Sequence, residues 1–388
     1  MAAAKKTPPH TRASGAAHPA VLSARELNRA TLDRQLLLRR STLTAERAVA
    51  HLVGLQAQNT RPPYFQLFAR LAGFAPSDLS ALMESRAVVR TVTLRSTLHT
   101  HTAEDALTLR PLVQPARERE LHLFRKGLVG VDTARLARIA QELVEERPRT
   151  VRELRQALLE EWPGADPLAL TVAARCLLPL VQVTPRGLWD RSGQVALTTA
   201  GHWLGRTAPA PLSPDALVLR YLAAFGPASV RDLQTWAGLT MMREVFDRLR
   251  PRLLTFRDEN GTELFDLPDA PRPGPDVPAP PRFLPEFDNV LLGHADRTRV
   301  IPAVHHGRNG KGNQAYGTVL VDGFLAAVWR LERGKGRGGA AVVTVQPFEP
   351  LRPADRDAVT AEAAHLLDVM TDADEHDVRF GHVVDFDG

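Results

Sequence analysis

The sequence predicts an α+β protein with three tandem winged helix-turn-helix motifs followed by a C-terminal β-rich unit. One observation is an internal repeat, since TVREL at 150–154 returns as SVRDL at 229–233. A second is the Asn260-Gly261 pair, a strong hairpin turn placed after a run of helical patterns. The third is the dense β-like patterning beyond residue 281, with another tight turn at Asp322-Gly323.

Composition narrows the class of protein. The chain has 388 residues, which suggests two to four structural units, and a hydrophobic share of 44% that is ordinary for globular cores. Its net charge of +5 favours anionic partners such as nucleic acid. Cys176 is the only cysteine, which excludes disulfides within the chain and zinc sites built on several cysteines. No apolar run reaches membrane-spanning length, so we expect a soluble protein of a reducing compartment with no membrane partner.

The first 20 residues are rich in Ala, Pro, Thr and Lys and carry no apolar core, so they read as a disordered basic tail and not as a secretory signal. The first winged-helix unit then spans 21–102. Ser23 and Glu26 form a capping box for a helix expected to run to Arg40. Thr44 opens a second helix, Pro62 a third, and a short helix ends at Ser85. Residues 87–102 alternate like a β-hairpin.

Gln56 and Gln58 lie in a polar linker between the second and third of these helices. In an extended linker, residues two apart point to the same side. Two neutral amides aimed together can hold one water or read one base edge. The alternative is a pair of solvated glutamines in a loop.

Residues 103–147 are predicted to form a helical connector. Its many arginines are partly compensated by neighbouring glutamates, which favours a solvated helix face for most of them. The second winged-helix unit is placed at 148–206 and the third at 212–268, each containing one copy of the repeat. In this motif the third helix commonly enters a DNA groove. Three such units on a basic chain favour a nucleic-acid binder over a protein-interaction module.

A Pro-rich linker at 270–281 precedes the C-terminal unit, 282–388. Strands are expected at 318–321, 324–329 and 341–345, and a last helix is signalled by the spacing of Val359, Ala363, Leu366 and Met370. Two glycine-rich basic segments, 307–312 and 333–337, could touch phosphates or simply be mobile.

Metal and cofactor signals are weak. His99 and His101 form an H-x-H pair and His305 and His306 are adjacent, but neither pair has further ligands at local spacing. There is no phosphate-binding loop of the nucleotide-hydrolase type and no dinucleotide fingerprint. We therefore expect neither a metal nor a cofactor.

Several short stretches together resemble the AlkZ-like DNA glycosylases, a family of the winged-helix superfamily that also includes the YcaQ-type enzymes. They are GLQAQ at 54–58, LLLRR at 36–40, RSTLH at 95–99, LPEFD at 284–288 and LLGHADR at 291–297. The resemblance covers about residues 20 to 380, in order. The YcaQ-type branch has an aspartate at the second position of the glutamine pair, whereas this chain has Gln58, which places it on the AlkZ side.

The resemblance implies a C-shaped arrangement of winged helices around duplex DNA and catalysis by Gln56 and Gln58. The expected activity is that of a monofunctional glycosylase that excises cationic N7-alkylpurines, by water attack at C1′. The lesion could be an interstrand crosslink or a simple N7-alkylguanine, and the sequence leaves both open. The protein is expected to be a monomer of the bacterial cytoplasm, associated with the nucleoid while it acts. The residues expected at DNA are Arg61, Arg90, Arg95, His99, Arg308, Lys311, Asp322 and Gly323.

Two alternatives remain beside this interpretation. Glu286 and Asp288 could supply a catalytic carboxylate, although hydrogen bonding and structure within the C-terminal unit is the role that we favour for them. The chain could also be a non-catalytic transcription regulator with tandem winged helices. Release of a base from alkylated DNA separates the two functions.

Overall fold

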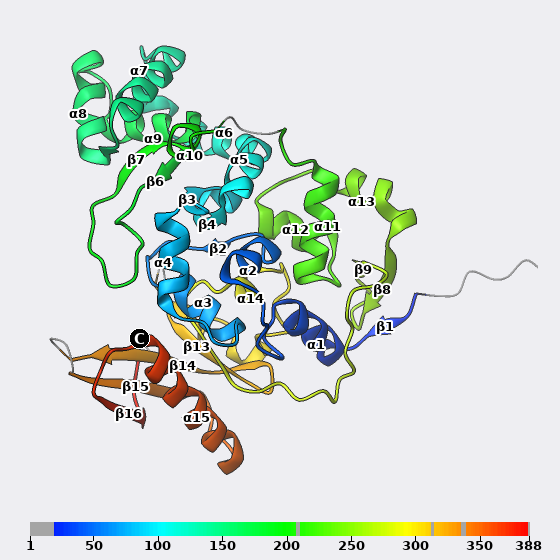
Figure 1. Cartoon of the computed structure of the whole chain (residues 1–388). Helices are drawn as coiled ribbons and strands as arrows, with labels where there is room; N and C mark the ends of the chain where they lie inside the picture. The colour runs from blue at the N-terminus through cyan, green and yellow to red at the C-terminus, as the bar shows by residue number, and fades with distance from the viewer. Residues whose placement is uncertain (1–18, 207–209, 312–313, 335–338, 387–388) are drawn as a thin grey trace, which may run out of the picture.

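The computed structural model describes residues 19–206, 210–311, 314–334 and 339–386. It confirms the mixed α+β class, with helices and strands interleaved along the whole chain (Figure 1). Four regions follow one another: 19–102, 103–206, 210–269 and 282–386. No helix in these described ranges is long and apolar enough to cross a membrane.

The first region begins with a short strand and four helices and ends in a hairpin. Its elements are β1 (Val21–Leu22), α1 (Ala24–Arg34), α2 (Ala45–His51), β2 (Leu55–Gln56), α3 (Pro62–Arg70), α4 (Pro76–Glu84), β3 (Val88–Val92), the 3-10 turn η1 (Leu94–Ser96) and β4 (Leu98–Thr102). The capping box of Ser23 and Glu26 is confirmed. The expected extension of α1 to Arg40 is wrong, because Leu36 adopts a left-handed backbone (φ 59°) that ends the helix.

The second region adds six helices and three short strands. They are α5 (Ala103–Leu112), α6 (Gln114–Leu123), η2 (Arg125–Leu128), α7 (Thr133–Glu146), β5 (Arg149–Thr150), α8 (Val151–Glu161), α9 (Pro167–Leu177), β6 (Leu180–Gln182), β7 (Ala196–Thr199) and α10 (Ala200–Leu204). Leu136 and Val144 of α7 lie in one apolar core with Leu154 and Leu170. Helix α7, which the sequence assigns to a connector, therefore packs as part of this region.

One six-stranded sheet joins the first two regions, in the order β2-β4-β3-β6-β7-β5. The contact between them is the antiparallel pair β3–β6, in which Thr91 faces Val181. The hairpin of the first region is thus internal to a larger sheet, and its central strands are shielded from solvent. This burial matters for the polar residues that the hairpin carries.

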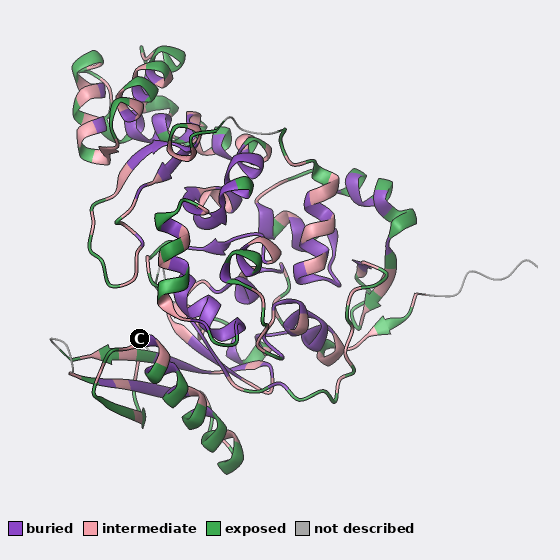
Figure 2. Ribbon diagram, viewed as in Figure 1, coloured by how far each residue is buried: buried purple, intermediate pink, exposed green. Residues whose placement is uncertain are grey.

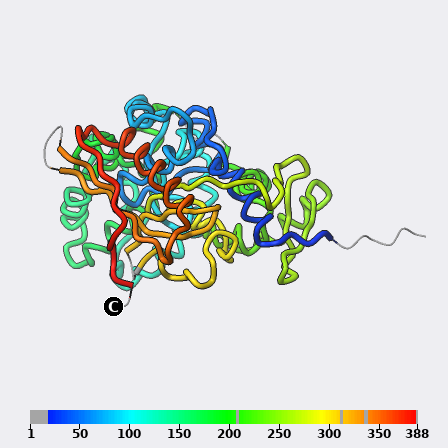
Figure 3. Tube along the Cα trace, turned by 90° about the horizontal axis from the view of Figure 1, so that it is seen from below, coloured from blue at the N-terminus to red at the C-terminus, as the bar shows by residue number. Residues whose placement is uncertain are grey.

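The third region has three helices and a hairpin: α11 (Pro214–Phe225), α12 (Val230–Ala237), α13 (Arg243–Leu249), η3 (Arg250–Arg252), β8 (Leu254–Asp258) and β9 (Glu263–Asp266). The repeated phrases do begin helices in the same way, since Thr150 with Glu153 and Ser229 with Asp232 both form capping boxes. β1 pairs with β8 in parallel, so the first described strand lies beside this hairpin (Figures 1 and 3).

The C-terminal region is a five-stranded sheet in the order β10-β13-β14-β15-β16, with one long helix against it. Its elements are β10 (Arg282–Leu284), α14 (Asn289–Leu292), η4 (Ala303–His305), β11 (Gly310–Lys311), β12 (Gln314–Ala315), β13 (Gly317–Val321), β14 (Phe324–Arg333), β15 (Ala340–Pro347), α15 (Pro353–Met370) and β16 (Glu375–Phe380). The last helix and the tight turn at Asp322-Gly323 follow the sequence expectation.

The cores of the first and C-terminal regions are continuous. Phe65 and Phe68 of α3 belong to the same apolar cluster as Trp329 of β14 and Leu366 of α15. Figure 2 shows the buried residues concentrated in the centre of the molecule, while the outer face of α15 is exposed. The C-terminal sheet is therefore held against the helix that follows the glutamine stretch.

Candidate active site

The glutamine stretch leaves α2 through a sharp turn. Val53 and Gly54 both have positive φ, 56° and 91°. A Cβ on Gly54 would lie 2.3 Å from the ring of His101, so the close approach of this ring requires glycine. The chain then enters β2, where Leu55 pairs with Thr100 and Gln56 with His99. The expectation of an ordinary loop is wrong for Gln56, which lies in a strand at the edge of the six-stranded sheet.

The two glutamines differ in their surroundings. Gln56 is only 5% exposed, and its backbone carbonyl accepts a hydrogen bond from the side chain of Gln66, at 3.0 Å. Gln58 is exposed, two residues beyond, where β2 has ended. Gln58 is therefore the more exposed member of the pair, and most of the Gln56 side chain is enclosed by the fold.

The Arg95 guanidinium holds the side chain of Gln56. Its Nη2 donates to Oε1 of Gln56 at 2.6 Å, and its Nη1 donates to the carbonyl of Trp236 in α12. Burial lowers the pKa of Arg95 to about 10, and the nearby charge of Arg297 acts in the same direction. The expectation that Arg95 faces phosphate overlooked this contact, which joins residues 39 positions apart in the sequence.

Arg90 supports the same stretch from the other side. It is 2% exposed, and its guanidinium donates to the carbonyl oxygens of Ala57 at 2.9 Å and Asn59 at 3.4 Å. Burial lowers its pKa to about 10. Arg90 thus spans the backbone around Gln58 and does not face solvent, so in this structure it supports the site from inside the protein and is not placed to meet a phosphate.

His99 and His101 are also interior residues. Their rings stack at 5.5 Å between centroids, and both are at most 2% exposed. Burial lowers the pKa of His101 to about 4 and that of His99 well below its ordinary value, so both are neutral near pH 7. His99 consequently offers DNA no positive charge. Across the described residues, no cluster of His, Cys, Asp or Glu is arranged to hold a metal ion.

Arg61 is the expected DNA contact that does reach the surface near the glutamines. It precedes α3, its side chain is 54% exposed, and it forms an ion pair of 3.1 Å with Asp190. Its guanidinium lies 5.8 Å from the ring centroid of Trp189. An exposed ion pair contributes little to stability, so exchange of Asp190 for a phosphate costs the fold little.

A cleft of about 590 Å³ opens beside the exposed end of the glutamine stretch. Its lining includes Asn59 and Arg61 after the glutamine stretch and Glu286, Tyr316 and Trp329 of the C-terminal region. Asn59 Nδ2 donates to Oε1 of Glu286 at 2.9 Å. The sequence carries no local signal for this contact, because 227 positions separate the two residues.

The second alternative carboxylate, Asp288, is structural. It is fully buried and accepts two hydrogen bonds from Arg70, at 2.7 and 2.8 Å. The same carboxylate caps α14 through the backbone N–H of Val290. Asp288 therefore ties α3 to the C-terminal region and has no free oxygen to offer a substrate at the surface.

The C-terminal residues expected at DNA separate into two groups. The turn of Asp322 and Gly323 is docked on α1, where Asp322 pairs with Arg25 and Arg29 and the Gly323 carbonyl accepts from Asn28. Arg308 is half-buried, with its guanidinium 5.3 Å from the ring centroid of Phe348. The side chain of Lys311 lies outside the described residues. The 321–324 turn is thus held against α1, although 42% of the Asp322 side chain stays exposed.

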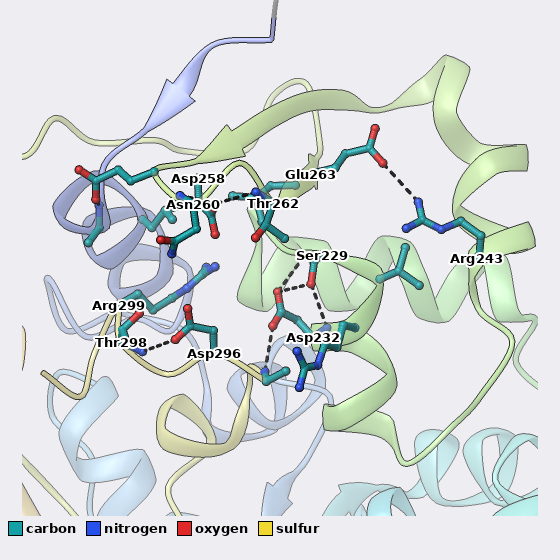
Figure 4. Close-up of a pocket in the computed structure, with 17 residues that line it drawn as sticks. Ser229, Asp232, Arg243, Asp258, Asn260, Thr262, Glu263, Asp296, Thr298 and Arg299 are labelled. Carbon is teal, nitrogen blue, oxygen red and sulfur yellow. Dashed lines mark hydrogen bonds and ion pairs between the residues drawn. The ribbon is translucent and has the colours of Figure 1, made fainter. Parts of the chain in front are cut away.

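A separate cavity of about 300 Å³ lies where the third region meets the start of α1 and the 295–299 segment (Figure 4). Two of its carboxylates accept hydrogen bonds within the protein: Asp232 from Ser229 and from Ala295 N, and Asp296 from Thr298 N. The arginines of α13 are likewise ion-paired, Arg243 with Glu263 and Arg248 with Asp215. The cavity contains none of the expected site residues, and we assign it no chemistry.

Comparison with known proteins agrees with this architecture. A family model described as "DNA glycosylase AlkZ-like" matches residues 49–369, which include the glutamine stretch and most of the residues that line the cleft. The solved structure of Streptomyces sahachiroi DNA glycosylase AlkZ is similar, with a TM-score of 0.74 and 20% sequence identity over 93% of this chain and 100% of that chain. At this identity the likeness shows a shared fold. A comparison with curated protein sequences gives no match. The family model spans most of the chain, and this chain therefore belongs to the AlkZ-like DNA glycosylase family.

Proposed function

We propose that this protein is a monofunctional DNA glycosylase that releases cationic N7-alkylpurines from duplex DNA by hydrolysis at C1′. Family membership supports a glycosylase acting on DNA. The observation that carries the finer proposal is the position of Gln58. It is exposed at the end of β2, while Arg90 holds the backbone on both sides of it and Arg95 holds Gln56.

Hydrolysis of a cationic N7-alkylpurine can proceed with two amide side chains and without a stronger base. A glutamine side chain cannot take a proton from water at neutral pH. An N7-alkylpurine already carries a positive charge, so it leaves the sugar without acid assistance. Positive charge then develops at C1′, and a fixed polar group can orient water toward that carbon and offset the charge. A neutral purine would be a poor substrate for so weak a pair.

We place the duplex against the exposed edge that carries Gln58 and Arg61, with the three helical regions acting as winged-helix units around it. Arg61 is the cation closest in sequence to the glutamines, and its exposed ion pair allows exchange for a phosphate. The cleft beside Asn59 and Glu286 adjoins this surface and has a volume of about 590 Å³. An open cleft of this kind also suits a bulky adduct, since a crosslinked base cannot be flipped into a closed pocket.

The test is base release under single-turnover conditions from a duplex with one N7-methylguanine and from a duplex with one N7-linked interstrand crosslink. The unaltered chain should release the base, and Gln58→Ala should be slower by roughly 10- to 1000-fold, the scale for loss of a positioned polar group. Borohydride should trap no covalent complex with DNA, because a monofunctional enzyme uses water. Sequence-specific binding without base release would instead support a tandem winged-helix regulator.

A further inference from the structure

We propose that Arg95 is a positioning residue that fixes the amide of Gln56 with its oxygen inward and its nitrogen available to the DNA, so that Gln56 serves as a hydrogen-bond donor. This inference rests on the proposed function and gives the two glutamines different roles in it. Gln58 would then be the member that accepts hydrogen bonds from water.

The orientation of the Gln56 amide follows from the chemistry of its partner. A guanidinium has five N–H donors and no acceptor. The atom of Gln56 that lies 2.6 Å from Arg95 Nη2 must therefore be the amide oxygen. The amide nitrogen on the same carbon therefore points away from Arg95 Nη2, and among the described residues it donates to no acceptor. With an exposed fraction of 5%, the side chain has little room to turn over.

Arg95 is itself held in place. Its backbone is left-handed (φ 53°), as is that of the next residue, Ser96 (φ 56°), at the tip of the β3–β4 hairpin. A Cβ on Gly238 would lie 2.9 Å from the Arg95 Cα, so the end of α12 packs directly on this tip. The second hydrogen bond of the guanidinium goes to the Trp236 carbonyl at that helix end. The contact therefore links Gln56 to the third region through one side chain.

The consequence for catalysis is a division of roles. A cationic donor on the amide oxygen draws electron density from the group and strengthens its N–H donors. Such a donor can bind an acceptor atom on the nucleotide. If it were donated to the attacking water instead, it would reduce the nucleophilicity of the water oxygen. The water must instead donate its hydrogens to an acceptor, and Gln58 is the exposed amide that can provide one.

Gln56→Glu tests the orientation, because glutamate keeps the length and an oxygen for Arg95 but has no N–H donor. We expect its single-turnover rate to fall as far as that of Gln56→Met, roughly 10- to 1000-fold. Gln58→Glu, which keeps an acceptor oxygen at the second position, should lose less activity than Gln58→Ala. Equal activity of Gln56→Glu and the unaltered chain, with Gln58→Ala still impaired, would overturn this inference and leave the proposed function standing. If Gln58→Ala is also unimpaired, the proposed function itself fails.

Arg95→Met tests the positioning role. Its rate should fall roughly 10- to 100-fold while the affinity for undamaged duplex changes little, since the guanidinium is used within the protein. Arg95→Lys, which keeps a cationic donor, should recover part of the loss. Arg119 also bonds the end of α12, at the Gly238 carbonyl, without touching Gln56, so Arg119→Met is the matched control and should keep the rate.

The double variant Gln56→Met with Arg95→Met separates positioning from a merely structural role. If Arg95 acts through the amide, the double variant is as slow as Gln56→Met alone. Losses that multiply would overturn the proposal, as would an unaltered rate for Arg95→Met. Should Arg95→Met fail to fold, the comparison of Gln56→Glu with Gln58→Glu still decides the orientation.

Discussion

Asn59 donates a hydrogen bond of 2.9 Å to Glu286, so the half-buried carboxylate of the C-terminal region lies next to the residue that follows Gln58. This contact makes Glu286 the carboxylate that could compete with the glutamines for the role of base. Asp288, two residues on, cannot compete because both of its oxygens are bound to Arg70 within the core.

Glu286→Gln should keep the single-turnover rate within several-fold, because the new amide oxygen still accepts from Asn59 and the proposed chemistry needs no base. The rate of the unaltered chain should also be flat between about pH 6 and 9, since neither glutamine titrates there. A loss of more than roughly 100-fold in Glu286→Gln, together with an acidic limb in the pH profile of the unaltered chain, would assign the base to Glu286 instead.

Alanine at the two glutamines should affect folding unequally. Gln58→Ala should change the free energy of unfolding by less than about 0.5 kcal/mol, as expected for an exposed side chain. Gln56→Ala should lower it by about 1–3 kcal/mol, because Arg95 loses its partner within the protein. Urea unfolding measures both.

Gln58→Asp is the informative variant for substrate choice. A carboxylate can orient water and offset charge at C1′, so activity on N7-methylguanine should be kept. The added charge should disturb the binding of a bulky crosslink more than that of a methylated base. The ratio of the rate on N7-methylguanine to the rate on a crosslinked duplex should therefore be higher for Gln58→Asp than for the unaltered chain. A variant that loses both activities together would contradict a role for Gln58 in orienting water.

Duplex binding should show little sequence preference and should weaken steeply with salt, because phosphate contacts dominate such interfaces. Arg61→Met should reduce the slope of log Kd against log salt by about one. Arg90→Met is the contrasting variant. Its guanidinium is buried on Ala57 and Asn59, so it should lower the free energy of unfolding by about 1–3 kcal/mol and leave the salt slope unchanged. The opposite pattern would show that Arg90 turns outward to bind DNA.

The two C-terminal loops should respond differently to change. Asp322→Ala should lower the free energy of unfolding by about 1–2 kcal/mol, less than for a fully buried pair because 42% of the Asp322 side chain is exposed. Base release should be retained. Shortening the 307–312 loop should slow base release more than it affects folding. Equal single-turnover rates for the shortened and unaltered chains would remove this loop from the DNA surface.

Acid should destabilise the protein through its buried histidines. Burial lowers the pKa of His101 to about 4, against an ordinary value of 6.5 in the unfolded chain. Between these values the unfolded state binds a proton that the folded state does not, so the free energy of unfolding is highest above pH 6.5 and falls as the pH drops toward 4. His99 acts in the same direction. Urea midpoints measured across this range should show the fall, and His101→Gln should make it shallower. A constant midpoint would contradict the burial of these rings.

The sequence by itself determined the local features of this protein. The capping boxes at Ser23, Thr150 and Ser229 depend on residues three apart, and the Asp322-Gly323 turn depends on two neighbours, so composition and spacing suffice to predict them. The same is true of the α+β class. Short sequence stretches spread along the chain indicated the family, and the family model confirmed it.

Only the tertiary structure decided how the candidate site is built. Strand β2 pairs with β4 and strand β6 pairs with β3, so the β3–β4 hairpin is internal to the sheet. Arg90 and His99 on this hairpin are buried, although their residue types suggested an exposed DNA contact. The bond from Arg95 to Gln56, the contact of Asn59 with Glu286 and the docking of Asp322 on α1 all join segments distant in sequence. A side chain's partner and its exposure depend on which segments pack together, and no local pattern of residues carries that information.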